Sequence, residues 1–538
     1  MTSPRTRWFG LIFISLAVSL IIVDSTIVNV SIPSIIEDLG ITSTQVQWVQ
    51  ESYTLVFAAL LLVFGALADR FGRRRMLVIG MVIFTISSVL AGVAQSGDLL
   101  IGARILQGFG GAMVLPTTLS LVNANFQGKE RGIAFAVWGS TIGGMVAVGP
   151  LLGGWLTTDF SWRWAFGINI PLGIIIIIGA LLTVPESKQP RQGTGIDWAG
   201  ALLSVIAMST LVFGLIEGRT YGWWLTNKQF SLGGWDWPSG GISVIPVMFG
   251  VFLLTLVAFI FHGLRREKTG KDPLIPFHLF KISSFSNGNI AAMVISLGEF
   301  GIILSLPLWL QFVVGYDALQ TGFVILALAI GAFLASGIAG GFGRKLSPVT
   351  MVRSGIVLEV IGVAGIGLSI SPSATWVNVV PFLFVYGMGV GLATAQLSNV
   401  ILKDVPIAES GAASGTQSVS RQLGSALGIA VLGTILFTST QIQLTNMLTD
   451  EKLPAAQVTQ VVNAVVDSAG GAIIGLEANP TTRPIADNAK IAITDGTRYG
   501  AFAAAGFLAL GFLTTLSLGK TRKEEVEHMV AEGDKKPF

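Results

Sequence analysis

Long apolar runs separated by short polar turns follow one another along the chain. Most runs have about the 20 residues that a helix needs to cross a hydrocarbon layer about 30 Å thick. They are continuous and lack the alternation of barrel strands, so helices are predicted. The expected helices are 8–30, 47–68, 76–94, 99–123, 132–156, 165–184, 198–217, 241–262, 285–310, 319–342, 351–371, 377–400, 414–438 and 498–518. About fourteen crossings, an even number, place both termini on one side of a membrane.

The distribution of Lys and Arg predicts the orientation. Cytoplasmic loops carry an excess of these residues, and here they gather in every second loop, for example at 73–75, 265–271 and 344–345. Arg163, Arg219 and Lys228 are exceptions on the other side. We therefore expect a multi-pass protein of the bacterial inner (plasma) membrane with both termini in the cytoplasm.

Composition narrows the function classes. The 538 residues are 52% hydrophobic and 12% charged, about half the charged fraction of soluble proteins. The absence of Cys excludes disulfides, thiolate metal sites and cysteine nucleophiles. The three His lie near loops or in the tail, and no nucleotide-binding Gly-x-x-x-x-Gly-Lys-Ser/Thr pattern occurs. We predict no enzyme activity, no cofactor, no metal site and no nucleic acid partner; the lipid bilayer is the expected surrounding.

Two polar segments interrupt the series of apolar runs. The first, 217–241, holds four Trp residues whose rings favour the headgroup level of a membrane. The second, 439–496, is too long for an ordinary connection and carries an apolar pattern at helical spacing around Val458 and Val462. We expect a helical hairpin on the outer surface there, with a disordered loop as the alternative.

A glycine-rich basic turn follows the second predicted helix. Its glycines permit close approach, and its charged side chains can bind a partner across an interface. The candidate gate residues are Gly65, Asp69, Arg70, Gly72, Arg73 and Arg74. This stretch resembles the loop signature of the major facilitator superfamily. The resemblance implies that Asp69 locks a cytoplasmic gate by binding the amino end of a helix that begins near Gly411.

Three further stretches resemble motifs of the same superfamily. Leu100–Gly111 is similar to its fourth-helix motif, in which a buried arginine, here Arg104, is implicated in proton coupling. The stretch from Val23 to Pro33, with Asp24 inside an apolar run, resembles the signature of the fourteen-helix drug:proton antiporters. A fifth-helix stretch resembles the antiporter signature and implies export; its residues are Gly144, Gly149, Pro150, Gly153 and Gly154. Structural ion pairs, hydrogen bonds and a plain helix kink are the alternatives.

The resemblance extends over nearly the whole chain and implies an all-α membrane fold of two six-helix bundles with two additional helices between them. The expected parts are 1–190 for the N-terminal bundle, 191–283 for the additional helices and linkers, 284–518 for the C-terminal bundle with its long extracellular loop 439–496, and 519–538 for a cytoplasmic tail. A weaker basic turn at 340–345 is consistent with an internal repeat but lacks the aspartate.

Ionisable residues inside apolar helices are candidates for proton coupling, because burying a charge without a function or a partner is costly. The candidates for proton coupling or substrate binding are Asp24, Glu51, Arg104, Glu299 and Glu359. Surface exposure is the alternative for Glu51, and a pairing role within the bundle is the alternative for Glu359.

Together these features predict a secondary transporter that exports small molecules in exchange for protons by alternating access. The proton gradient would be its energy source, and we expect a monomer. Acidic cavity residues and the resemblance favour hydrophobic cationic drugs as cargo. An endogenous lipid, amino acid or metabolite is the alternative cargo, and a channel or a transport-derived sensor is the alternative class of protein.

Overall fold

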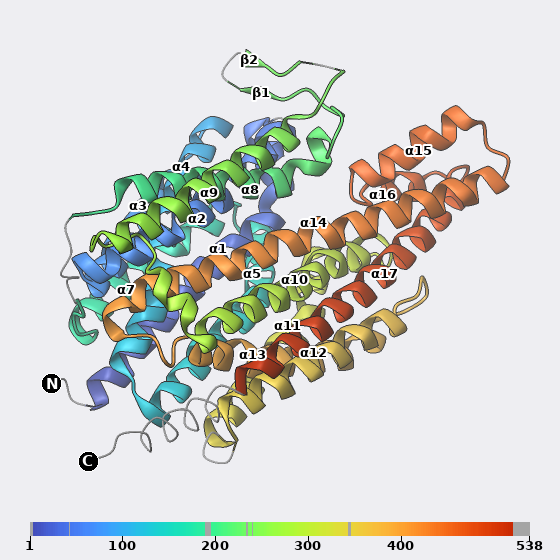
Figure 1. The fold of residues 1–538 in the computed structure, drawn as a ribbon. Helices are drawn as coiled ribbons and strands as arrows, with labels where there is room; N and C mark the ends of the chain where they lie inside the picture. Colours follow the sequence, from blue (N-terminus) through green and yellow to red (C-terminus); the bar gives the residue numbers. More distant parts are fainter. Residues whose placement is uncertain are drawn as a thin grey trace, which may run out of the picture.

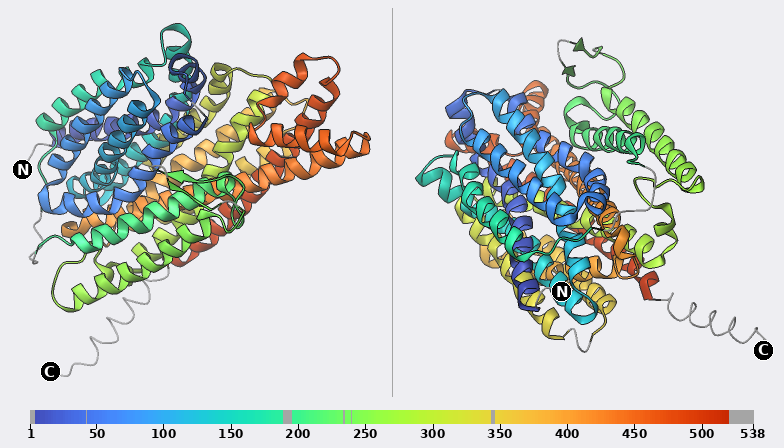
Figure 2. Two further views of the ribbon diagram at one scale, coloured as in Figure 1. Left: turned by 90° about the horizontal axis from the view of Figure 1, so that it is seen from above. Right: turned by 90° about the vertical axis from the view of Figure 1, so that its left-hand side faces the viewer.

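A computed structural model describes residues 4–41, 43–188, 195–232, 235–238, 240–342 and 346–519, and nearly all of them lie in helices. The helices run roughly alongside one another in two groups (Figure 1), with a helix pair against their flank (Figure 2). The predicted domain boundary at 190–191, the basic turn at 343–345 and the tail from 520 onward lie outside the described residues.

The first group forms the N-terminal bundle. In it α1 packs on α5 and α7, α2 packs on α4, and α3 packs on α4 and α7. The predicted sixth helix is divided near Ile168 into two pieces. The bounds are α1 Pro4–Leu39, α2 Ser43–Phe71, α3 Arg73–Gly92, α4 Gly97–Asn125, α5 Gly128–Asp159, α6 Trp164–Gly167 and α7 Asn169–Thr183.

The second group forms the C-terminal bundle. In it α10 packs on α14 and α17, α13 on α11 and α12, and α17 on α12 and α14. The bounds are α10 Ser283–Phe312, α11 Ala318–Phe342, α12 Pro348–Ser369, α13 Trp376–Ile401, η2 Ile407–Glu409, α14 Ser410–Asp450, α15 Ala455–Asp467, α16 Ala472–Ala478, α17 Arg483–Thr515 and η3 Leu516–Gly519.

A helix pair, α8 Trp198–Tyr221 and α9 Val244–Lys268, connects the two bundles. Its helices pack on each other, and α8 also contacts α2 and α14. Asp197 fixes the pair: its carboxylate caps α8 at Gly200 N (3.0 Å), accepts from Leu274 N (3.1 Å) and lies 2.8 Å from His262 Nε2. A short hairpin, β1 Ser231–Leu232 and β2 Trp235–Asp236, stands clear of the helices at the far end of the pair, and η1 (Phe277–Lys281) precedes α10.

The polar segment 439–496 is helical. The outer parts of α14 and α17 extend through it to Asp450 and from Arg483, and α15 and α16 connect them at one end of the molecule (Figure 1). Val458, Val462 and Val465 are buried on one face of α15, as their spacing requires. The segment thus prolongs two helices of the C-terminal bundle.

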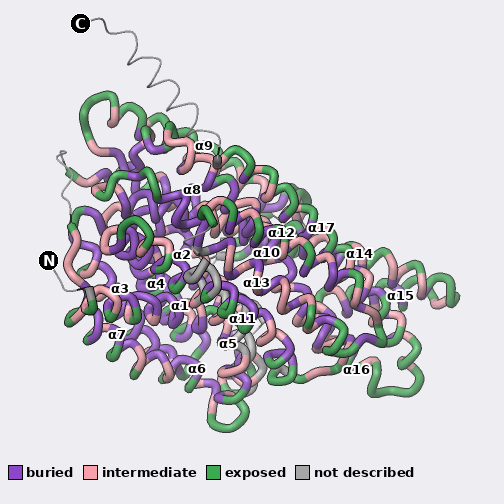
Figure 3. The backbone as a smooth tube through the Cα atoms, turned by 90° about the horizontal axis from the view of Figure 1, so that it is seen from below, coloured by how far each residue is buried: buried purple, intermediate pink, exposed green. Residues whose placement is uncertain are grey.

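The surface of the long helices is that of a membrane protein. Thirteen helices in the described ranges are long and apolar enough to span a bilayer. The predicted crossing 132–156 corresponds to α5, which has 32 residues and packs against α1 and α11. Large apolar side chains such as Leu182, Leu254 and Phe261 point outward and are 70–76% exposed, while buried positions concentrate in the interior (Figure 3). Such outward-facing side chains are suited to lipid, not to water.

Candidate functional site

The carboxylate of Asp69, at the end of α2, lies against the start of α14. It accepts hydrogen bonds from Gly411 N (2.8 Å) and Ala412 N (3.0 Å). These amides belong to the first turn of a helix, where N–H groups have no partner inside the helix and the helix dipole favours an anion. The structure therefore contains the contact between Asp69 and the helix near Gly411 that the sequence predicted.

Arg73 completes this contact. Its guanidinium pairs with Asp69 at 2.7 Å and donates to Ile407 O (2.5 Å) in the other bundle and to Ser187 Oγ (2.9 Å) after α7. The pair is fully buried, which makes its hydrogen bonds costly to lose. Two bundles and three segments of the chain thus meet at one arginine.

The rest of the basic turn is held within the N-terminal bundle. The Glu186 carboxylate accepts from Arg74 N (3.1 Å) and also lies near the Arg74 guanidinium. Gly72 has a φ of 110°, and a Cβ there would lie 2.8 Å from the Glu186 carboxyl carbon, so the turn requires glycine. Arg70 is exposed, and among the described residues no contact is assigned to it.

Close helix packing surrounds the Asp69 contact. A Cβ on Gly65 would lie 2.6 Å from Gly411 O and 2.9 Å from Gly415 Cα, so α2 and α14 approach as closely as they do only because these positions lack side chains.

Further hydrogen bonds join the bundles at the same end. Asn123 Nδ2 donates to Ser410 Oγ (2.7 Å), and Arg131 Nε donates to Asn399 Oδ1 (3.0 Å). Gln396 Nε2 donates to Gly132 O (3.2 Å). No local sequence pattern predicts these pairs, because their members are separated by more than 260 positions. Together with Asp69 and Arg73 they close this end, which we call the Asp69 end.

Asp24 lies at the centre of a buried polar cluster in the N-terminal bundle. Arg104 of α4 pairs with its Oδ2 at 2.6 Å, and Oδ1 accepts from Asn169 Nδ2 (2.7 Å) and Gln107 Nε2 (3.1 Å). Asp24 and Arg104 are at most 1% exposed. The buried arginine of the fourth-helix motif thus has Asp24 as its counter-charge.

The remaining donors of Arg104 are also engaged. Its Nε donates to Val49 O (3.2 Å), and its guanidinium carbon lies 4.3 Å from the centre of the Tyr53 ring. Ser88 Oγ accepts from Gln107 and Asn169. Gln107, Asn169 and Ser88 also belong to this cluster. Gln107 stands in the Leu100–Gly111 motif, but nothing in the sequence identified its partner.

A second buried cluster lies in the C-terminal bundle. Glu299 of α10 is 4% exposed. Its Oε2 lies 3.7 Å from Arg421 Nη2, and its Oε1 accepts from Thr394 Oγ1 (3.4 Å). Glu359 of α12 packs against Gly389 of α13, the helix that also carries Thr394, and interacts electrostatically with Glu299 and Arg421. Each bundle thus places a carboxylate of its first helix against an arginine of a later helix.

Glu51 lies apart from the Asp24 and Glu299 clusters, on the side of α2 that faces α8. It is half-buried on α2 and interacts electrostatically with Tyr221 of α8. Its setting is therefore the contact between the N-terminal bundle and the connecting pair.

The predicted antiporter glycines lie where α5 meets its neighbours. A Cβ on Gly149 would collide with Thr26 of α1, and one on Gly153 would lie 2.9 Å from Ile27 O. A Cβ on Gly154 would lie 3.8 Å from Leu319 of α11, in the other bundle, whereas one on Gly144 would have no described atom within 4 Å. Pro150 lies within the bounds of α5, but its side chain is outside the described part.

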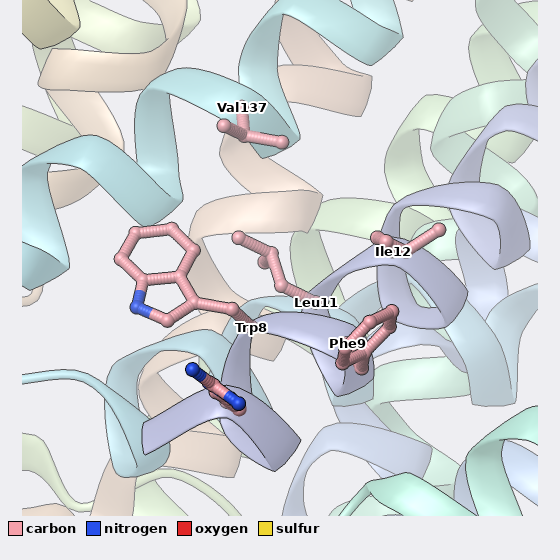
Figure 4. A pocket seen from close by; sticks show the side chains of 6 residues that line it. Trp8, Phe9, Leu11, Ile12 and Val137 are labelled. Carbon is pink, nitrogen blue, oxygen red and sulfur yellow. The ribbon is translucent and has the colours of Figure 1, made fainter.

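A cavity of about 480 Å³ lies beside the beginning of α1 and faces α5 (Figure 4). Phe9 and Ile12 at its rim are 59% and 50% exposed, so it opens to the outer, lipid-facing surface. No predicted site residue lines it; the lining consists of Arg5, Trp8, Phe9, Leu11, Ile12 and Val137.

Comparisons with known proteins agree with this architecture. The Major Facilitator Superfamily profile matches residues 14–429. The probable actinorhodin transporter of Streptomyces coelicolor is 35% identical over 444 residues, which are 80% of this chain and 72% of that protein. The multidrug efflux pump LfrA of Mycolicibacterium smegmatis is 30% identical over 497 residues, 92% of each chain.

Solved structures share the fold at low identity. The human organic anion transporter MFSD10 (TETRAN) aligns with a TM-score of 0.56 and 13% identity, over 96% of this chain and 100% of that one. The proton:xylose symporter XylE aligns with a TM-score of 0.56 and 12% identity, over 88% and 96%. With the profile match over most of its length, the chain belongs to the Major Facilitator Superfamily and is a multi-pass membrane transporter of that family.

Proposed function

We propose that this transporter exports small molecules in exchange for protons by alternating access. The observation that carries the proposal is Asp24, a buried carboxylate inside a membrane-spanning helix, whose charge is balanced by Arg104. A proton on Asp24 would cancel its charge and release the arginine. A membrane-buried ion pair of this kind responds to a proton by changing its contacts.

The proposed cytoplasmic gate consists of the contacts that Asp69 and Arg73 make with the other bundle. The excess of Lys and Arg in alternate loops supports a cytoplasmic location for the Asp69 end. The contacts of Asp69 with α14 and of Arg73 with Ile407 of η2 then hold the transporter closed toward the cytoplasm. Opening requires these hydrogen bonds to break, so protonation and cargo binding must offset their loss.

Hydrophobic cationic drugs are the proposed cargo. Relatives of the chain are named multidrug efflux pumps or multidrug resistance proteins. Glu299, a buried carboxylate whose nearest cation is 3.7 Å away, is a suitable partner for a positively charged ligand. Export of an endogenous metabolite is the second candidate, because another relative is named a probable actinorhodin transporter.

The test is cargo-dependent proton movement across proteoliposomes loaded with a pH-sensitive dye. Cationic dyes, neutral antibiotics and lipids are supplied in separate experiments. We expect cationic dyes to drive proton release and a proton gradient to drive dye accumulation. Ion conductance without coupling would instead indicate a channel, and cargo movement that ignores the gradient would refute exchange.

A further inference from the structure

Glu359 of α12 is a buried carboxyl group without a hydrogen-bonding partner. Its side chain is 0% exposed, and neither carboxyl oxygen has a hydrogen-bond partner within the described ranges. The surface of α13 closes over it at Gly389, where a Cβ would lie 2.6 Å from Glu359 Cγ. The side chain is therefore sealed between two helices.

Two arginines near the ends of α12 donate hydrogen bonds to main-chain carbonyl groups. Arg353 donates to Thr515 O (2.9 Å), and Arg498 of α17 donates to Ile370 O (3.0 Å). Arg421 of α14 attracts Glu359 electrostatically but forms its ion pair with Glu299. An ionised carboxylate in such a setting would have neither water nor a hydrogen bond to stabilise it. A protonated, neutral Glu359 would avoid this cost.

Glu299 is the neighbouring carboxyl group, and its surroundings differ. Arg421 and Thr394 both approach its oxygens, and Tyr386 Oη donates to its main-chain carbonyl at 3.2 Å. Glu299 and Glu359 also repel each other when both are charged. Among the described residues, Glu299 thus has a cation and a hydrogen-bond donor at its carboxyl group, whereas Glu359 has neither at hydrogen-bond distance.

A small cavity adjoins Glu299. Its volume is about 10 Å³, close to the space that one water molecule needs. Gln417, Ser398 and Arg421 line it with Glu299, and no donor among the described residues reaches the buried acceptor Gln417 Oε1. A water molecule here would donate to Gln417 and to Glu299, which gives Glu299 a path for proton exchange that Glu359 lacks.

We propose that Glu299 and Glu359 form a second proton-binding site, in which Glu359 holds the proton and Glu299 exchanges it with the polar cavity. In the transfer, the O–H bond of Glu359 breaks as an O–H bond forms on the Glu299 carboxylate, and the negative charge moves to Glu359. This inference rests on the proposed proton exchange and deepens it. If both Asp24 and the Glu299–Glu359 pair bind a proton, each cycle moves one proton more than it would with Asp24 alone.

The first experiment reads the proton on Glu359 without transport. Infrared difference spectra between neutral and alkaline pH should show the carbonyl stretch of a buried protonated carboxylic acid in the wild type. Glu359→Gln should abolish that band and leave the melting temperature nearly unchanged, because the amide resembles the neutral acid. Glu186→Gln, at a half-exposed carboxylate that is paired with arginines, is the matched control and should retain the band. A band that persists in Glu359→Gln would overturn the inference.

The second experiment counts protons per cargo molecule from the gradient that just stops net export. Glu359→Gln should still export cargo but with one proton fewer per cycle. If Glu359→Gln still couples export to protons and moves as many protons per cargo molecule as the wild type, the second proton-binding site is ruled out. If the wild type itself shows no coupling of cargo to protons, the proposed proton exchange is wrong, and so is the extra proton per cycle. The infrared band still shows independently whether Glu359 is protonated.

Discussion

Asp69 binds the main-chain amide of Gly411 across 342 positions of the sequence. The bond joins the end of one helix to the beginning of another in the opposite bundle. It is charge-assisted at both partners, since the amide lies at the positive end of a helix of 41 residues. Separation of the bundles at this end requires this bond to break.

Replacing Asp69 by Asn should therefore loosen the Asp69 end. Hydrogen bonds to a charged group contribute about 1.5–3 kcal/mol, so the open population should rise about tenfold or more. The chain has no cysteine, and Ser414→Cys places a single thiol in the buried first turns of α14. Its maleimide labelling rate should increase about tenfold in Asp69→Asn. Asp159→Asn, at an exposed position, is the control; equal rates in all three proteins would contradict the gate.

Replacing Asp24 by Asn should abolish proton coupling and destabilise the N-terminal bundle. Arg104 would remain buried without its counter-charge, a change that typically costs about 3–5 kcal/mol. Proton release in proteoliposomes and thermal unfolding in detergent measure the two effects. Asn169→Ala removes one donor but keeps the ion pair, so it should be milder in both. Full proton-coupled export by Asp24→Asn would show that the cluster is structural.

Replacing Gly149 by Ala should disturb the contact of α1 with α5. The new methyl group would collide with Thr26, and overpacking typically costs about 1–3 kcal/mol. Gly144→Ala lies on the same helix in open space and should be close to neutral. Adding Thr26→Ala to Gly149→Ala should restore part of the lost melting temperature. Similar losses in both single variants would mean that helix flexibility, not close packing, requires the glycines.

The end opposite Asp69 has a pH-dependent contact. Hydrogen bonds from Arg163 and from Trp162 Nε1 lower the pKa of Asp38 below its ordinary value of 3.8. A lowered pKa in the folded state means that the contact stabilises the fold above pH 3.8 and loses its effect as the pH falls through the folded-state pKa.

Asp38→Asn should accordingly melt at a lower temperature than the wild type at pH 7, with the difference shrinking below about pH 4. Thermal unfolding of both proteins between pH 7 and pH 3 tests this. The same comparison for Asp317→Asn, whose carboxylate accepts from Gln320 N in the loop before α11, provides a reference without an arginine. A difference that grows toward low pH would contradict the sign.

Hydropathy predicted the membrane-spanning helices, because they depend on local patterns. The partner of Asp69 lies 342 positions away and was expected only from the resemblance to the superfamily. The partner of Glu299 was not predicted, because Arg421 stands on another helix, α14, and only the folded bundle brings the two side chains together. The outer ends of α14 and α17 were also missed as parts of those helices. Their sequence turns polar beyond residue 438 and before 498, so hydropathy ends the membrane span while the helix continues.

Because α14 is long, a small tilt at the Asp69 end produces a larger displacement at its opposite end. At about 1.5 Å per residue, its 41 residues extend about 60 Å from Gly411 to the α15–α16 end. If it moves as a rigid rod, a tilt of about 5° at Asp69 displaces the far end by about 5 Å. The loss of one hydrogen bond at the Asp69 end would thus produce a larger displacement at the opposite end of α14. A pair of distance labels placed near α15 would report whether the Asp69 contact is formed, without altering that contact.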